Sequence, residues 1–318
     1  MVTSHGRRIN KLLRKIFKPT PSVAGKNCGI FMIYGPLSWF KEAYQKDYNY
    51  LGILMQKSIY EKSVEYLKSD PLKHLTTLKY LSLYQDKLTV SLVEGSQKWA
   101  LLVTIPTQIL SYDTTTYPYA NRAIFLNGTS EQLKYKLLET LPKSNYVLRL
   151  NESLDLDNLI NRFDISKGNS YISYSCSSID DSFKDIIVPG NTNITDEAID
   201  IIKRNGYIES DIRKYFNNGA VWFGFIKDNR IRSICFIYQN YDNIWEIAGV
   251  HTPETERKKG YARIVVTSAL TYILERKLTP RYVTDIRNIY SIQLAESLQM
   301  KQFLRINHFL LSPRQVSH

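Results

Sequence analysis

The residues with the clearest chemical potential lie between positions 245 and 262, where a predicted strand runs into a cationic turn and then a helix. Positive side chains fill the turn, and Gly260 stands at its exit. Amide groups at a helix start, with their partial positive charge, bind pyrophosphate. Glu246 lies on the strand before the turn and offers a carboxylate. The combination predicts an enzyme that uses a phosphorylated cofactor.

Hydrophobic periodicity and capping residues predict the elements that position this segment. Two helices come first, one capped by Thr195 and one over 209–217, followed by strands at 221–226, 231–238 and 244–251. A helix over 261–275, a strand over 281–286, a helix over 289–298 and a strand over 303–310 complete the order. This order, α-α-β-β-β-α-β-α-β, predicts a mixed α/β (α+β) domain with a mostly antiparallel central sheet flanked by helices.

The order and the residues within it resemble the GNAT N-acyltransferase superfamily. The family signature, Arg/Gln-x-x-Gly-x-Gly/Ala between a strand and a long helix, matches residues 257–262, Arg-Lys-Lys-Gly-Tyr-Ala. Pro253 precedes it, and an Asn-x-x-Ser pair at 288–291 follows one strand later, at the position of the family's next helix. The resemblance covers about residues 195–311 and implies the GNAT fold.

The resemblance also implies acetyl-CoA, or another acyl-CoA, as cofactor and no metal. Backbone amides of 258–262 would hold the pyrophosphate, and Gly260 has no side chain to block their approach. The strand residues before the turn and the Asn-Ser pair would hold the pantetheine arm. The implied cofactor-binding residues are Val250, Thr252, Arg257, Lys258, Lys259, Gly260, Tyr261, Ala262, Asn288 and Ser291. Two plainer interpretations stay open: the lysines form a solvated face, and Asn288 is a helix cap.

In this superfamily an amine attacks the thioester directly, which requires a base, donors for the developing oxyanion and a proton for the thiolate. Glu246 is the candidate catalytic base, and the plainer interpretation is a strand glutamate that pairs with a basic side chain. Many members carry a tyrosine acid where this chain has Ala295, and nearby Tyr290 lies on another helical face. We therefore expect an N-acetyltransferase, with a catalytically inactive acyl-CoA-binding or RNA-associated protein as the alternative.

The first half of the chain looks like a degenerate copy of the same fold, so we expect a tandem protein. The predicted division is a basic extension over 1–52, a degenerate GNAT-like domain over 53–160 and an acyltransferase domain over 170–318, with a polar linker over 151–170. The first half lacks the signature, and residues 113–120 stand where we expect its cradle. In related two-domain enzymes such a half forms one wall of the acceptor pocket. The candidate wall residues are Tyr112, Tyr117, Pro118 and Tyr119.

Composition limits the partners and the compartment. The formal net charge of +12 calls for a negatively charged partner, such as the cofactor or an RNA, beside an amine-bearing small molecule or protein acceptor. Three cysteines and five histidines show neither a disulfide framework nor a metal-ligand pattern, so we expect a reducing, cytoplasmic setting. No acidic residue precedes Glu42, and a mitochondrial transit peptide or an RNA- or membrane-binding arm shares this basic composition. No apolar run reaches the roughly 18 residues of a membrane span.

Overall fold

A computed structural model describes residues 45–314, with side chains from residue 56 onward. The first half begins with two helices and continues through a hairpin into a β-α-β unit. Its main elements are α2 (Gln45–Lys68), α3 (Leu75–Leu83), β1 (Thr89–Gly95), β2 (Lys98–Pro106), α4 (Ser111–Thr116), β3 (Arg122–Gly128), α5 (Glu131–Glu139), β4 (Tyr146–Leu150) and β5 (Phe163–Ser175).

The second half repeats this plan. Its main elements are β6 (Gly190–Asn191), α6 (Asp196–Lys203), α7 (Glu209–Asn217), β7 (Val221–Lys227), β8 (Arg230–Tyr241), β9 (Ile244–His251), α8 (Tyr261–Glu275), β10 (Thr279–Asp285), α9 (Ile289–Ser297) and β11 (Lys301–Pro313). Short 3₁₀ helices lie at Thr107–Ile109, Asp157–Leu159, Asp181–Phe183 and Glu254–Glu256. The predicted order of elements is confirmed.

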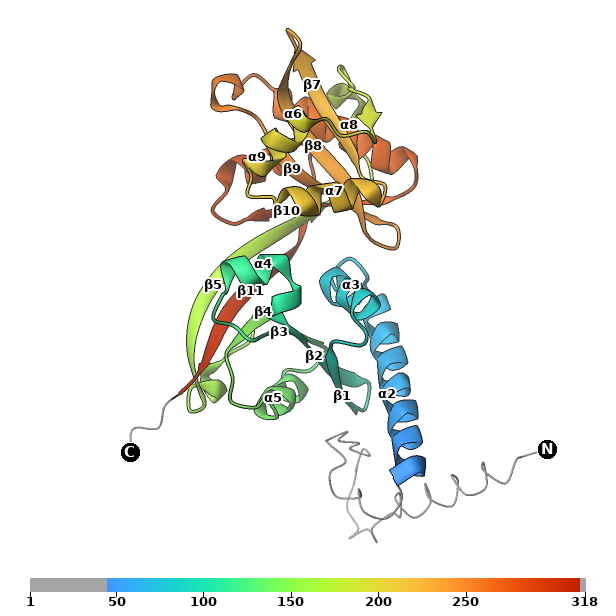
Figure 1. Cartoon of the computed structure of the whole chain (residues 1–318), viewed down its shortest axis with the longest axis vertical. Helices are drawn as coiled ribbons and strands as arrows, with labels where there is room; N and C mark the ends of the chain where they lie inside the picture. Colours follow the sequence, from blue (N-terminus) through green and yellow to red (C-terminus); the bar gives the residue numbers. More distant parts are fainter. Residues whose placement is uncertain (1–44, 315–318) are drawn as a thin grey trace, which may run out of the picture.

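One continuous sheet of eleven strands joins the two halves, in the order β1-β2-β3-β4-β11-β5-β10-β9-β8-β7-β6 (Figure 1). Its only parallel pairs among the described residues are β3–β4 and β9–β10, and the remaining pairs are antiparallel. The prediction of a mixed, mostly antiparallel sheet flanked by helices is therefore confirmed.

Local chemistry explains several boundaries. The side chains of Ser130 and Thr195 accept hydrogen bonds from the amides of Leu133 and Ala198 and so cap α5 and α6. The turn between β7 and β8 has both central residues, Asp228 and Asn229, at positive φ, as a tight hairpin requires.

Each half exchanges its last strand with the other. The first half places β1-β2-β3-β4 side by side, and the second places β7-β8-β9-β10 in the same arrangement, each with one helix (α5 or α8) linking its parallel pair. The strand beside β4, however, is β11 from the end of the chain, and the strand beside β10 is β5 from the first half. Long pairing between β5 and β11 then bridges the halves (Figure 1). The repeated topology supports a tandem origin.

The linker prediction is wrong over its second part. Strand β5 begins at Phe163 and pairs with β11 from Pro313 to Lys301. Ser166 and Lys167 of β5 are exposed, because this stretch has a solvent-facing side. A polar strand of this kind lacks the hydrophobic run by which strands are recognised. Helix α2 begins at Gln45, and residues 1–44 of the predicted basic extension lie outside the described part.

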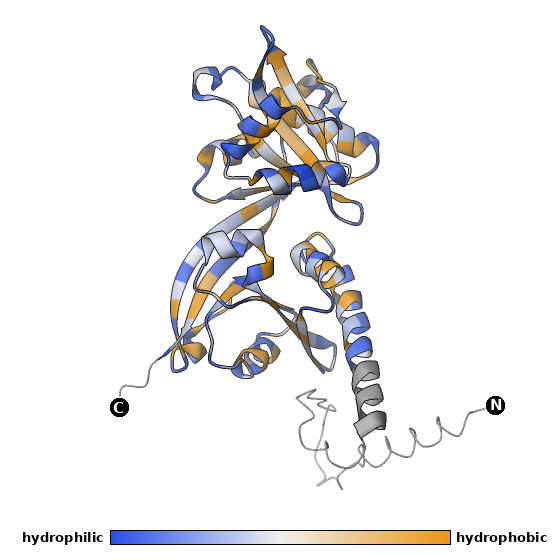
Figure 2. Ribbon diagram, in the orientation of Figure 1, coloured by the Kyte–Doolittle hydropathy of each residue, from blue (hydrophilic) through white to orange (hydrophobic). Residues whose placement is uncertain are grey.

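The core is divided between the two faces of the sheet in each half. In the second half, α8 covers a face that includes Ile247 and Tyr282, whereas α6 and α7 cover a face that includes Phe236 and Ala248. The central strands are largely hydrophobic and α7, at the junction of the halves, is hydrophilic (Figure 2). Helix α3 of the first half reaches β8 across this junction. Within residues 45–314, no helix has the length and apolar character to cross a bilayer.

Candidate functional site

The parallel strands β9 and β10 separate in the middle of the sheet. They pair from Ile244–Thr279 to Ile247–Tyr282, and no pairing follows, although β9 runs on to His251 and β10 to Asp285. A bulge in β9 accompanies the split: Gly249 has φ +60°, and a Cβ there would lie 2.6 Å from the ring of Phe236. The split opens one edge of the strand to a ligand's polar groups.

The turn after β9 has the backbone of an anion cradle. Lys258 and Gly260 have φ of +62° and +82°, and α8 starts directly after Gly260. The first bond of α8 runs from the Ile264 amide to the Gly260 carbonyl at 3.2 Å, so the amides of 261–263 have no partner inside the helix. A Cβ built at Gly260 meets nothing within 4 Å. The turn therefore combines unpaired helix-start amides with open space beside Gly260, an arrangement that fits a pyrophosphate.

The side chains of the turn partly neutralise one another. Arg257 donates to the Thr252 carbonyl at 3.1 Å and lies 3.4 Å from a Glu254 oxygen. Lys259 forms an ion pair with Glu256 at 3.0 Å. Three cations thus stand against two carboxylates in this turn, and the cradle depends more on backbone amides than on lysine charge.

The strand residues proposed for the pantetheine arm already have partners. The Val250 carbonyl accepts a hydrogen bond from Asn205 at 3.0 Å, and the Thr252 hydroxyl bonds that of Ser233 at 2.8 Å. A carbonyl has two lone pairs, so Val250 keeps one acceptor position. Tyr261, at the start of α8, stacks on Phe225 with ring centroids 4.5 Å apart. The next residue, Ala262, lies in the same first turn of the helix.

Asn288 caps the helix that follows β10. Its side-chain oxygen accepts from the Ser291 amide at 3.2 Å, as the plainer interpretation has it. Because β9 and β10 are parallel, their carboxyl ends lie at the same edge of the sheet, so Asn288 and the cradle share that edge. The Asn288 side-chain NH₂ has no hydrogen-bond partner among the described residues. A capping role therefore leaves a donor for a ligand.

Glu246 lies at the base of the split, paired with Arg281 across β9 and β10. One oxygen, Oε2, accepts from Arg281 at 2.5 Å and from Asn240 at 2.5 Å. The other oxygen, Oε1, has no hydrogen bond to any described residue. It is also not one of the buried side-chain atoms that lack a partner. The plainer interpretation, a strand glutamate that pairs with a basic side chain, is therefore confirmed for Oε2. The ion pair fixes the side chain, and Oε1 remains able to accept a proton.

The first half contributes to this site through α3. The ammonium of Lys79 lies over the ring of Tyr238, 5.4 Å from its centroid, and Tyr238 is the cross-strand neighbour of Glu246. Burial lowers the pKa of Lys79, an effect that the Glu246 charge opposes. No local sequence signal marks Lys79 or Arg281, because both reach Glu246 only through the sheet and the junction of the halves.

The usual acid position is closed. Ala295 is 1% exposed and packs in the core beneath α8, whereas Tyr290 is 66% exposed. Ala295 has no proton to donate, and Tyr290 makes no hydrogen bond to a described residue.

The equivalent site in the first half is filled. It lies where β3 and β4 end and α5 begins, at 128–131, and not at 113–120 as we expected from the sequence. Pairing of β3 with β4 continues to the last residue of β4, so these strands do not split. Ser130 caps α5, and Glu131 places a negative charge where a phosphate would bind.

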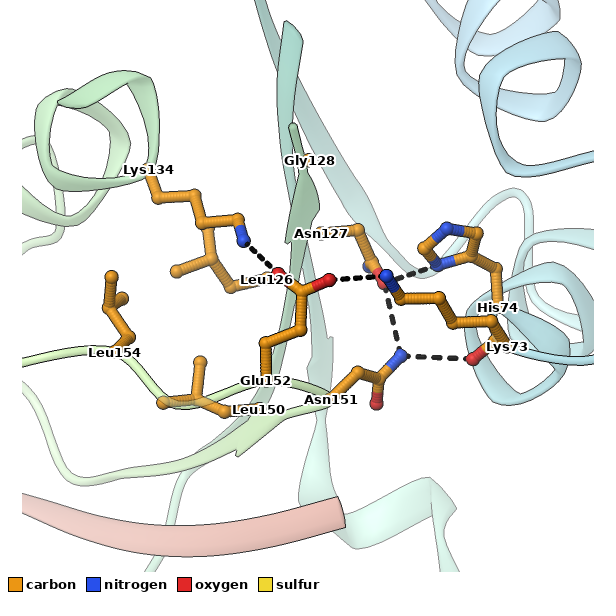
Figure 3. A pocket seen from close by; sticks show the side chains of 10 residues that line it. All are labelled: Lys73, His74, Leu126, Asn127, Gly128, Lys134, Leu150, Asn151, Glu152 and Leu154. Carbon is orange, nitrogen blue, oxygen red and sulfur yellow. Dashed lines mark hydrogen bonds and ion pairs between the residues drawn. The ribbon is translucent and has the colours of Figure 1, made fainter. Parts of the chain in front are cut away.

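Side chains close the remaining space there (Figure 3). Glu152 binds both Lys73 and Lys134, and His74 bonds Asn127 at 3.0 Å. The cavity that remains is about 10 Å³, the space of at most one water molecule. This equivalent site therefore has no room for a cofactor.

The described residues contain no group of three or more His, Cys, Asp or Glu side chains that could hold a metal ion.

Comparison with known proteins agrees with the resemblance. Residues 209–302 match the family model described as GNAT acetyltransferase. No curated protein matches the chain. Three of the solved structures that are similar to the chain are the following.

An acetyltransferase from the GNAT family of Colwellia psychrerythraea has 11% identity and a TM-score of 0.49, and the match covers 80% of this chain and 97% of that one. A GCN5-related N-acetyltransferase from Sphaerobacter thermophilus has 9% identity and a TM-score of 0.47, covering 76% and 87%. A tandem GNAT protein from the clavulanic acid biosynthesis pathway has 11% identity and a TM-score of 0.45, covering 77% and 89%.

The family match spans the strand split, the cradle and the cap of α9. The predicted resemblance to the GNAT superfamily is confirmed for the second half of the chain, where the family model matches.

Proposed function

We propose that this protein transfers an acyl group, most simply acetyl, from acyl-CoA to a primary amine. The observation that carries the proposal is the pairing of two features at one sheet edge: the split between β9 and β10, and the open amides that follow Gly260. Residues 209–302 match the GNAT acetyltransferase family model, and this match supports acyl transfer as the reaction class.

The chain supplies a binding frame for such a cofactor. The amides after Gly260 would hold the pyrophosphate, and the free edge of β9 near Val250 and the Asn288 NH₂ would hold the pantetheine arm. Bound acyl-CoA supplies an activated thioester carbonyl. The donors that bind the arm would fix it within the split.

Glu246 is the candidate base. The ammonium first gives one proton to a base, and the neutral amine then attacks, which forms the C–N bond and breaks the C–S bond. The second proton that the nitrogen loses passes through water to the departing thiolate, and the first is the one that the base takes. Oε1 of Glu246 is free to take that proton, directly or through one water, while Arg281 and Asn240 hold the carboxylate through Oε2.

Calorimetric titration of the purified protein with acetyl-CoA and with free CoA tests the proposal. Micromolar binding of both, followed by turnover with a panel of amines, is the expected result. Binding without turnover on any amine would leave the alternative of an acyl-CoA-binding protein, which the filled acid position at Ala295 would favour. No binding by a folded sample would overturn the cradle and direct the search to RNA or protein partners.

A further inference from the structure

A second cavity, separate from the cradle, lies between the two halves of the chain. Its volume is about 200 Å³, well above the roughly 10–15 Å³ that a single water molecule needs on the same measure. The lining residues come from α3, α4, β3, β4, β5, β10 and β11 and the start of the loop after β4. They are Thr76, Thr77, Tyr80, Tyr112, Phe125, Asn127, Arg149, Asn151, Tyr171, Val283, Ile306 and His308.

The only charge in this lining is positive. Arg149 is its single cation, and none of the lining residues is acidic. The guanidinium is 7% exposed and pairs through Nη2 with Asp113, which is fully buried and does not line the cavity. The Nε of Arg149 is buried and has no hydrogen-bond partner. The ion pair with Asp113 therefore holds the Arg149 guanidinium in the cavity wall, and some of the guanidinium N–H donors remain unused.

A second donor comes from His308, the neighbour of Arg149 across β4 and β11. The Asn169 amide donates to the Tyr117 hydroxyl at 3.2 Å, so that hydroxyl is free to donate its own proton to His308 Nδ1, 2.8 Å away. Burial, helped by the positive Arg149, lowers the pKa of His308 to about 3. The ring is then neutral, and its proton lies on Nε2, which has no partner among the described residues.

Two tyrosines supply a third donor. The hydroxyls of Tyr112 and Tyr171 bond each other, and the Asn169 side chain donates to both at 3.2 Å. The hydrogen bond between the two hydroxyls uses one of their two protons, so the other proton remains available to a ligand. Of the four candidate wall residues, Tyr112 alone lines the cavity. Tyr117, Pro118 and Tyr119 lie outside the lining, and Tyr119 is 86% exposed.

The cavity extends toward the candidate base. Along β10, Val283 lines the cavity and Arg281, two residues earlier on the same face, binds Glu246. Along α3, Tyr80 lines the cavity and its neighbour Lys79 lies at the Glu246 site. Three strand spacings, up to about 14 Å along the sheet, separate the strand of Arg149 from that of Val283.

We propose that this cavity is the acceptor site and takes an elongated molecule with a carboxylate at one end and the reacting amine at the other. Arg149 and His308 would hold the carboxylate, the aromatic walls would contact the aliphatic body, and the amine would point toward Glu246. The acceptor role depends on the proposed acyl transfer; the carboxylate site does not.

Direct binding tests the proposal without turnover. The wild-type protein is titrated with 6-aminohexanoate, hexanoate, hexylamine and glycine. We expect 6-aminohexanoate and hexanoate to bind, and hexylamine and glycine to bind at least about tenfold more weakly, because each lacks either the anchoring carboxylate or the length. Equal affinity for hexylamine, or no binding of either carboxylate, would overturn the carboxylate site.

Variants locate the site. Removing Arg149 alone would leave Asp113 buried without its partner, so the double variant Asp113→Asn/Arg149→Gln removes both charges together and keeps a hydrogen bond. We expect it to weaken 6-aminohexanoate binding about tenfold or more, and His308→Phe to weaken it less. Arg122→Gln, an arginine outside the cavity, is the matched control and should bind normally. An unchanged affinity in a folded double variant would contradict the assignment.

A parallel titration with acetyl-CoA separates this proposal from the function. Acetyl-CoA binding without 6-aminohexanoate binding overturns the cavity alone. Binding of 6-aminohexanoate without acetyl-CoA overturns the acceptor role and leaves a carboxylate site. With both bound, acyl transfer to 6-aminohexanoate at a higher kcat/KM than to glycine is the expected final result.

Discussion

A charge placed at Gly260 tests the cradle most directly. Gly260 has φ +82° with open space around its Cβ position, so Gly260→Glu costs only the left-handed backbone, about 1–2 kcal/mol of folding stability. A carboxylate about 5 Å from a bound phosphate repels it by about 3 kcal/mol at an effective dielectric constant of about 20. Exposure to water reduces this, so we expect about 1.5–3 kcal/mol, roughly a ten- to hundredfold loss of acetyl-CoA affinity.

Gly219 provides the matched control. It has φ +86°, and a Cβ there also meets nothing within 4 Å. Gly219→Glu should therefore lower the free energy of unfolding as much as Gly260→Glu, measured by urea denaturation, and leave calorimetric acetyl-CoA affinity unchanged. Equal affinity losses in the two variants, or none in Gly260→Glu, would refute the cradle.

Three further outcomes are expected. Glu246→Gln should lower kcat about 10²- to 10⁴-fold with acetyl-CoA affinity unchanged, checked in steady-state and calorimetric assays on a sample shown to be folded, since Arg281 loses its charged partner; full activity would remove Glu246 as the base. Gly249→Ala combines φ +60° with a Cβ 2.6 Å from Phe236, so the free energy of unfolding should fall by about 2–4 kcal/mol in urea titrations; a loss under about 1 kcal/mol would contradict the tight bulge. His308 stays neutral in the fold, with a pKa of about 3 against 6.5 unfolded, so the unfolded state binds more protons between these values and stability falls as pH falls from 6.5 toward 3. At pH 5 the loss relative to pH 7 is about 2 kcal/mol, and His308→Phe should abolish that part of the pH dependence; an identical pH dependence in the variant would show that His308 is not held neutral.

The sequence determined the parts of this protein that depend on local chemistry. The turn at 257–262, the bounds of β9 and α8, and the Ser130 and Thr195 caps follow from residues adjacent in the chain, because helix starts and tight turns are set by nearest neighbours. The family signature is of this kind, since it describes one turn and the helix after it.

Tertiary structure alone decided the contacts between distant segments. The Glu246–Arg281 pair joins strands thirty-five positions apart, and Lys79 reaches the same site from the other half. The residues of β5 have the composition of a polar linker, and they form a strand by pairing with β11. Backbone hydrogen bonds to a distant strand leave no hydrophobic pattern in the sequence. The cavity around Arg149 and His308 exists because β11 returns from the end of the chain to lie beside β4. Hydrogen bonding across the sheet, and not any local preference, brings those donors together.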